Sequence, residues 1–235
     1  VQAETQNETN VRLRLVQANI PQALKWRPDL REAHFERHMA LTMGAGFEKT
    51  NVVIWPEMAT PYVLSADPER RARMRPAVPA GGLLLTGAPR LTMTGANGAP
   101  MSSNGLVALD DNGEVVGGYD KFHLVPFGEY VPFGFSWIPG LQKLVGPIGR
   151  FEAGDRPAVL PVRAGERNLL AGPLICYEDI FPQLALGTVR AGADFLFVCT
   201  NNAWFGEEGC TEQHAAHSVL RAVELRRPVL RCGNH

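Results

Sequence analysis

Hydrophobic positions along the chain fall into two kinds of segment. Short runs rich in aliphatic and β-branched residues predict buried strands, and stretches with apolar residues three or four apart predict helices. The predicted strands span residues 11–20, 51–57, 83–88, 103–109, 114–119, 172–175, 193–201 and 228–232, and the predicted helices span 29–47, 181–189 and 211–226. Strands that alternate with helices, with a hairpin inserted, predict an α/β fold with a mixed or layered sheet.

Three polar residues follow apolar strands or hairpins, namely Glu57, Lys121 and Cys176. A helical pattern begins directly after Cys176, as at a strand-to-helix elbow, where a helix N-terminus can lower the pKa of a thiol. A thiol nucleophile needs a base for its proton and a cation or N–H donors for the oxyanion that forms at an acyl carbon. We therefore predict Cys176 as nucleophile, Glu57 as base and Lys121 as the stabilising cation.

Each of these residues also has a structural interpretation. Cys176 could be a small buried side chain at the end of a core strand, Glu57 a partner for a helix cap, and Lys121 a surface charge after a turn. A histidine could also serve as the base, because the two members of a Cys-His pair can be distant in sequence. His123 and His214 are the candidates, and their sequence context selects neither.

Composition narrows the function classes. The 235 residues, 45% hydrophobic and 20% charged with a net charge of −1, suit one large domain or two small ones and give no basic patch for nucleic acid. The four cysteines fit neither a Cys-x-x-Cys zinc pattern nor a disulfide scaffold. His34 and His38 have metal-ligand spacing but no acidic third ligand on the predicted helix, so we expect no metal. Glycine-rich nucleotide motifs are absent, and we expect no cofactor.

The stretch from residue 124 to 148 is unusually apolar. Its only charged side chains are Glu129 and Lys143 among many aromatic and aliphatic ones. It is too short and too rich in proline to span a bilayer. Such a segment either packs inside the protein or contacts a membrane and acyl chains. Residues 1–10 form a polar leader, and no run of about 18 apolar residues predicts a membrane span elsewhere.

Several motifs resemble the nitrilase superfamily, and in particular its apolipoprotein N-acyltransferase branch. The superfamily's Glu, Lys and Cys motifs are matched by residues 55–57, 119–124 and 174–178. The branch is matched by residues 121–132, by 19–22 with 25–26, and by 201–206 with 213–214. The resemblance covers residues 11–234, nearly the whole chain. Two departures concern one loop: an acidic stretch follows Gly206, and Asn202 stands where Asp is common.

The resemblance implies a nitrilase-like αββα sandwich over residues 11–235, incomplete at its C-terminus. It also implies a bacterial inner-membrane enzyme whose catalytic domain faces the periplasm, with transmembrane segments absent from this chain. The expected partners are a phospholipid acyl donor, the N-terminus of a lipoprotein and the membrane surface. The oligomeric state is not predicted.

The implied reaction is transfer of a fatty acyl group from a phospholipid, through a Cys176 thioester, to the N-terminal amine of a diacylglyceryl-cysteine lipoprotein. The resemblance implies supporting roles for Glu129, Tyr177 and Glu178, although Glu178 could simply be a first-turn acid favoured by the helix dipole. The implied substrate-binding residues are Trp26, Phe127, Tyr130 and Trp204. A soluble amidase that uses the same triad on a C–N bond is the main alternative, and a non-catalytic binding domain is another.

Overall fold

Two β-sheets face each other in the computed structural model, which describes residues 10–92, 101–132, 151–204 and 209–235. The first sheet has the order β1-β2-β3-β4-β5. Its strands are β1 (Leu13–Leu15), β2 (Val52–Ile54), β3 (Leu83–Thr92), β4 (Met101–Asp110) and β5 (Val115–Asp120). β1, β2 and β3 run parallel, and β3, β4 and β5 run antiparallel.

The second sheet has the order β6-β7-β8-β9. Its strands are β6 (Leu160–Ala164), β7 (Arg167–Ile175), β8 (Phe195–Thr200) and β9 (Val229–Gly233). β6 pairs with β7 antiparallel, and β7, β8 and β9 are parallel. In each sheet, therefore, three adjacent parallel strands end at the same edge.

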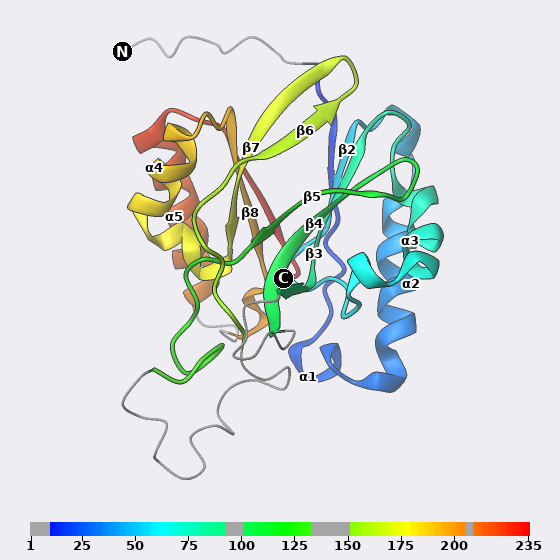
Figure 1. The fold of residues 1–235 in the computed structure, drawn as a ribbon, viewed down its shortest axis with the longest axis horizontal. Helices are drawn as coiled ribbons and strands as arrows, with labels where there is room; N and C mark the ends of the chain where they lie inside the picture. Colours follow the sequence, from blue (N-terminus) through cyan, green and yellow to red (C-terminus); the bar gives the residue numbers. More distant parts are fainter. Residues whose placement is uncertain (1–9, 93–100, 133–150, 205–208) are drawn as a thin grey trace.

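Helices cover the outer face of each sheet (Figure 1). The first sheet is covered by α2 (Arg31–Thr42) and α3 (Pro68–Met74), and the second by α4 (Pro182–Arg190) and α5 (Cys210–Leu225). The short helix α1 (Gln22–Lys25) lies beyond the end of the first sheet. Single 3₁₀ turns complete the described part: η1 (Pro28–Leu30), η2 (Phe47–Lys49), η3 (Leu64–Ala66), η4 (Arg75–Ala77), η7 (Cys176–Ile180) and η8 (Asn202–Trp204). The helix–sheet–sheet–helix layering confirms the predicted αββα sandwich.

Three apolar layers follow from this arrangement. In β2, Val52 and Ile54 pack between the sheets, whereas Val53 packs against the helices, as the two-residue period of a strand requires. Both faces are buried, which explains why β2 is a continuous apolar run without alternation. A further layer, with Leu174 and Leu196, lies between the second sheet and its helices. Each such fully buried side chain stabilises the fold by roughly 1.5–3 kcal/mol.

Element boundaries differ from the predictions in places. The strand predicted over residues 11–20 is limited to β1, and the helix predicted over 29–47 begins with η1 and ends at Thr42. The strand β6 and the first half of β7 were not predicted, because their apolar residues alternate with arginine and asparagine in a short hairpin. Among the described residues, no helix is both long and apolar enough to cross a membrane.

Candidate active site

Glu57 lies just beyond the end of β2 and is 6% exposed. Its Oε1 accepts a hydrogen bond from Asn104 Nδ2 at 2.8 Å, and its Oε2 accepts one from the Asn201 backbone N–H at 2.9 Å. Gly87 of β3 makes room for this turn, because a Cβ there would lie 2.5 Å from both Pro56 O and Met58 N. Each carboxylate oxygen of Glu57 thus has a fixed donor.

Lys121 follows β5 and is 1% exposed. Its Nζ lies 3.0 Å and 2.9 Å from the two carboxylate oxygens of Glu129, and 3.7 Å from Glu57 Oε1. Burial alone would lower the pKa of Lys121, but the charges of Glu57 and Glu129 outweigh it and raise the pKa above its ordinary value. The lysine is therefore a buried, permanently charged group held between two carboxylates.

Asn104, in β4, links those two carboxylates. Its Nδ2 donates to Glu57 Oε1 and to Glu129 Oε1, both at 2.8 Å. Glu129 Oε2 also accepts from the Val125 backbone N–H at 2.8 Å. Asn104 was not predicted as a site residue, because it stands in the polar first half of β4 between Ser103 and Gly105.

Cys176 is the first residue of η7 and directly follows β7. It is 6% exposed and has a left-handed backbone conformation with φ of 50°. Burial, followed by the negative charge of Glu57, raises the pKa of the Cys176 thiol to about 12 despite the opposing charge of Lys121. At neutral pH the resting thiol is protonated, so it needs a base at the moment of reaction.

Glu178 is fully buried and joins the elbow to the segment after β5. Its Oε1 accepts from the Tyr119 hydroxyl at 2.8 Å and from the backbone N–H groups of Phe122 and His123 at 2.8 and 3.0 Å. Its Oε2 accepts from the Ile175 N–H at 2.7 Å. Burial raises the pKa of Glu178, against the effect of the His123 and Ile175 donors. This one side chain therefore holds together the backbones that carry Lys121 and Cys176.

A second buried lysine contacts Glu57 from α1. Lys25 is 7% exposed, and its Nζ donates to the Glu57 carbonyl oxygen at 2.9 Å. Burial lowers the pKa of Lys25 to about 8, although the charge of Glu57 opposes this. No residue pattern marks Lys25 as buried, so its position emerges only from the fold.

Three of the four expected substrate-binding residues are described, and two of them pack on one cluster. Trp26 and Tyr130 pack against a small cluster of Met58, Leu124 and Phe151. Phe127 is 42% exposed. The side chain of Trp204 and residues 133–150 lie outside the described residues, so the second half of the apolar stretch remains a prediction.

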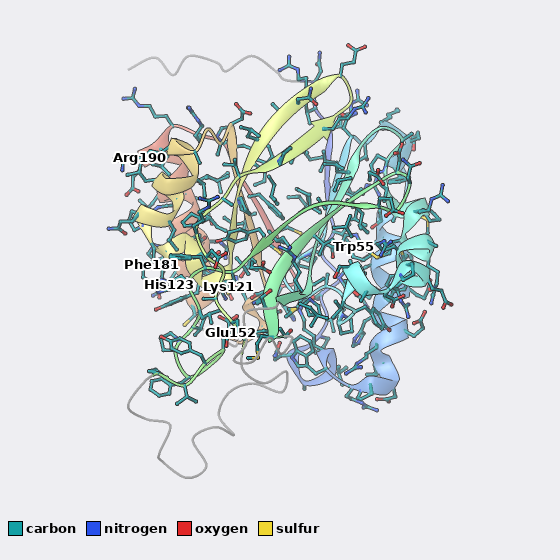
Figure 2. All side chains as sticks on the ribbon, in the orientation of Figure 1. Trp55, Lys121, His123, Glu152, Phe181 and Arg190 are labelled. Carbon is teal, nitrogen blue, oxygen red and sulfur yellow. The ribbon has the colours of Figure 1, made fainter. Side chains whose placement is uncertain are left out.

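Figure 2 shows His123 and Phe181 near one another, on the side where Lys121 is labelled. The ring centroid of His123 lies 4.1 Å from that of Phe181 and 5.8 Å from that of Tyr177. The other candidate base, His214, has Nε2 3.1 Å from the Cys176 carbonyl oxygen and Nδ1 2.9 Å from Asn202 Oδ1. Both histidines thus have structural contacts, whereas the charge of Glu57 acts on the Cys176 thiol.

The two histidines of α2 do not form a metal site. The His38 ring lies 5.0 Å from the Trp55 ring, and its Nδ1 bonds the His34 carbonyl oxygen at 2.8 Å. Burial lowers the pKa of His38 to about 4. In the described parts of the chain, no group of three or more His, Cys, Asp or Glu side chains is placed to bind a metal ion.

Fold and sequence together place this chain in a family of enzymes. The carbon-nitrogen hydrolase family model matches residues 12–235, and the chain belongs to that family. Solved structures with this fold include an amidase variant from Nesterenkonia sp. AN1 that carries the acetamide moiety of fluoroacetamide at its active-site cysteine. It is 18% identical with a TM-score of 0.58, over 99% of this chain and 79% of that one. The glutamine-dependent NAD⁺ synthetase from Acinetobacter baumannii is 15% identical with a TM-score of 0.61, over 94% and 38% of the two chains.

Curated relatives are more similar in sequence. The apolipoprotein N-acyltransferase of Brucella suis is 40% identical over 227 residues, which cover 95% of this chain and 42% of the relative. That of Geobacter metallireducens is 38% identical over 224 residues, with 94% and 41% covered. These relatives confirm the resemblance seen in the motifs. The chain spans about two fifths of their length.

Proposed function

We propose that this chain is the catalytic part of an N-acyltransferase that moves a fatty acyl group from a phospholipid to a lipoprotein N-terminus. The observation that carries the proposal is the buried group of Glu57, Lys121 and Glu129 next to the Cys176 thiol. It provides a base, a fixed positive charge and a nucleophile in one water-poor place, which is what acyl transfer through a thioester requires.

In the first half of the reaction, Glu57 takes the thiol proton as Cys176 Sγ attacks the ester carbonyl carbon of the phospholipid. Lys121 and the backbone N–H near Tyr177 stabilise the oxyanion. The C–O bond then breaks, the leaving alkoxide of the lysophospholipid takes the proton from Glu57, and the acyl group remains on Cys176 as a thioester.

In the second half, the N-terminal amine of a diacylglyceryl-cysteine attacks the thioester carbon. Glu57 takes the amine proton, the C–S bond breaks as the amide forms, and the proton returns to sulfur. Glu57 is suited to this exchange because Lys121 Nζ lies 3.7 Å from it, against 2.9 Å from Glu129. The more weakly paired carboxylate is the one free to accept a proton.

Both proposed substrates are lipids or lipid-linked, and some of the described residues suit them. The ring of Phe127 is 42% exposed in a segment that also holds Glu129 against Lys121. An exposed aromatic side chain beside a catalytic cleft suits contact with acyl chains at a membrane surface. Location on the periplasmic face of a bacterial inner membrane, and binding of substrate by Trp26, Phe127, Tyr130 and Trp204, are parts of this proposal.

The test is detection of the thioester. Incubation with phospholipid vesicles should add the mass of one acyl chain to the protein, and Cys176→Ala should abolish that adduct. Glu57→Gln keeps the size of the side chain and should slow adduct formation by roughly 10²–10⁴-fold. An acyl adduct that survives in the Cys176→Ala protein would contradict the assignment.

A second substrate separates the rival functions. A short aliphatic amide should be hydrolysed slowly or not at all, whereas a diacylglyceryl-cysteine peptide should remove the acyl group from the loaded enzyme. Rapid amide hydrolysis with no adduct from phospholipid would favour the amidase. Binding of lipopeptide with neither activity would favour a non-catalytic domain.

A further inference from the structure

Asn104 joins three charged residues of the site and is 2% exposed. Its side-chain amide donates to Glu57 Oε1 and to Glu129 Oε1, both at 2.8 Å. Its backbone carbonyl oxygen accepts from the Lys121 backbone N–H, also at 2.8 Å. One residue of β4 therefore fixes the relative positions of a carboxylate after β2 and of a lysine and a second carboxylate after β5.

The side-chain amide of Asn104 serves only as a donor. Its NH₂ group has two hydrogens, and each carboxylate receives one of them. Among the described residues, the buried Oδ1 of Asn104 has no hydrogen-bond partner, which costs stability. A rotated amide would turn Oδ1 toward two carboxylates, which have no hydrogen to donate when they are ionised. The orientation therefore suits a site in which both carboxylates carry their charge.

Two negative charges here share one positive charge. Lys121 Nζ lies 2.9 Å from Glu129 Oε2 and 3.7 Å from Glu57 Oε1. Both Oε1 atoms lie 2.8 Å from the same amide nitrogen, so the two carboxylates are close neighbours. Buried carboxylates in such proximity tend to hold one proton between them, because their like charges repel. A proton held there would occupy the base before the thiol could release its own.

We propose that Asn104 is a positioning residue of the active site, whose two N–H groups keep Glu57 and Glu129 as separate anions around Lys121. The inference rests on the proposed role of Glu57 as base. Hydrogen bonds to an ionised acceptor stabilise its charged form, so each N–H group opposes uptake of a proton by the pair. Glu57 is then free to take the proton of the Cys176 thiol, while Glu129 keeps the charge that pairs with Lys121.

Other titratable groups face the two carboxylates, and they set the conditions of a test. The carboxylates keep the pKa of Lys121 raised despite its burial. Burial raises the pKa of Cys176 to about 12 and that of Cys199 well above its ordinary value. Burial lowers the pKa of Lys25 to about 8, so this group titrates near neutral pH. An experiment that observes carboxyl groups alone, and compares a variant with the wild type, separates the pair from these neighbours.

The test compares the wild type with Asn104→Leu, which has a similar size and no donor. The measurement is the infrared absorption of protonated carboxyl groups from pH 6 to 10, without substrate. We expect Asn104→Leu to hold one additional protonated carboxyl group at pH 7 and to lose it with a midpoint of about pH 8, as buried carboxyl groups can. Asn104→Leu combined with Glu129→Gln has one carboxylate in place of the pair, and the additional group should be absent.

Acyl-enzyme formation provides a second readout. We expect Asn104→Leu to form the adduct about tenfold more slowly than the wild type at pH 7, and within about twofold of it at pH 9, where the base is free again. The matched control is Asn234→Leu. Asn234 is also a buried amide, 1% exposed, but it pairs with the Ile20 backbone and the Asn201 side chain. Asn234→Leu should lower stability without changing the infrared spectrum or the pH dependence of the rate.

Three results would overturn the proposal. The first is a folded Asn104→Leu protein without an additional protonated carboxyl group, and the second is a wild type that already holds that proton at pH 7. The third is an additional group that persists when Glu129→Gln is also present. A purely structural role of Asn104 would lower the rate by the same factor at every pH. The infrared measurement needs neither phospholipid nor lipopeptide, so it is independent of a failed acyl-transfer assay.

Asn104→Ser covers the case in which Asn104→Leu does not fold. A serine hydroxyl has one hydrogen and can donate to only one carboxylate at a time. We therefore expect the additional protonated carboxyl group to appear in Asn104→Ser as well. Its absence from folded Asn104→Ser would equally overturn the proposal.

Discussion

Two buried carboxylate clusters flank Cys176, and they are built from similar groups. The front cluster consists of Glu57, Asn104, Lys121 and Glu129, all from the first sheet and the segment after β5. The back cluster consists of Asp179, His214, Ser218 and Arg231, from η7, α5 and β9. Each contains a cation, a neutral polar side chain and at least one carboxylate, yet only the front cluster acts on the thiol electrostatically.

The difference lies in how completely the charges are paired. In the back cluster, Asp179 faces Arg231 Nη1 at 2.7 Å, the Ser218 hydroxyl at 2.6 Å and His214 Nε2 at 2.8 Å. In the front cluster, two carboxylates share Lys121, and Glu57 has the longer contact. A carboxylate with a cation of its own holds structure, whereas one that shares its cation beside a thiol is available to take a proton.

The largest expected effect comes from removal of the cation in the front cluster. Lys121→Met leaves Glu57 and Glu129 buried without their shared counter-charge and removes the group that we propose holds the oxyanion. We expect the rate of acyl-enzyme formation to fall by at least 10²–10³-fold, as for loss of an oxyanion-hole donor, and the free energy of unfolding to fall by about 3–5 kcal/mol. Intact-protein mass spectrometry and urea unfolding measure the two effects.

Arg231→Met is the matched variant of the back cluster. The Arg231 side chain is 18% exposed. After the change, its partner Asp179 keeps its close contacts with Ser218 and His214. We expect a loss of stability of about 1–3 kcal/mol and a rate per folded molecule within about tenfold of the wild type. If folded Arg231→Met lost as much activity as Lys121→Met, the back cluster would take part in the reaction as the front cluster does, and the distinction between them would be wrong.

The second prediction concerns the carboxylate of the back cluster. Asp179→Asn keeps the size of a fully buried side chain but removes the charge that faces Arg231. We expect the free energy of unfolding to fall by about 3 kcal/mol, because Arg231 loses its buried counter-charge, while folded protein still forms the acyl-enzyme. Urea unfolding measures the effect on stability, and single-turnover acylation measures the effect on the reaction. A loss of acylation without a loss of stability would contradict a structural role for Asp179.

The strand ends of this molecule were predictable from sequence, and their surroundings were not. Glu57, Lys121 and Cys176 each follow the end of an apolar run. Because strands that run in the same direction end at the same edge of a sheet, residues at such ends are expected to lie close together. Asn104 gives no comparable signal, because it lies in the polar first half of β4. Lys25 belongs to a motif that the resemblance matched, but nothing in its four-residue helix predicts that it is buried against Glu57. Their roles depend on which neighbours the packing of the two sheets brings near Glu57.

Local backbone geometry was the other unpredictable part. The expected helix after Cys176 begins only at Pro182, since a 3₁₀ turn with a left-handed first residue intervenes. Such a conformation is costly for a residue with a Cβ, and it persists where the surroundings fix it. Here the Glu178 carboxylate and the His214 ring bond the backbone on either side of the elbow. Glu178 belongs to the same turn, but His214 lies on α5, and no local pattern reveals that it meets the elbow.

The prediction with the smallest expected effect on acylation, and the one that tests burial near Glu57 most directly, is a pH dependence of stability due to Lys25. Burial lowers the pKa of Lys25 to about 8 in the folded protein, against an ordinary value of 10.5. Between those values the unfolded chain binds a proton that the folded protein does not, so Lys25 makes stability rise with pH across that window. Its contribution should increase by up to about 3 kcal/mol between pH 8 and 10.5.

The measurement is the difference in unfolding free energy between the wild type and Lys25→Met as a function of pH. The difference cancels the opposing fall from the buried cysteines, such as Cys232, whose pKa is raised to about 12. Lys49→Met removes an exposed lysine and should give a flat difference curve. A flat curve for Lys25→Met as well would mean that Lys25 reaches water. The Glu57 carbonyl would then lack its buried donor, and the front cluster would be more open on that side than the contacts indicate.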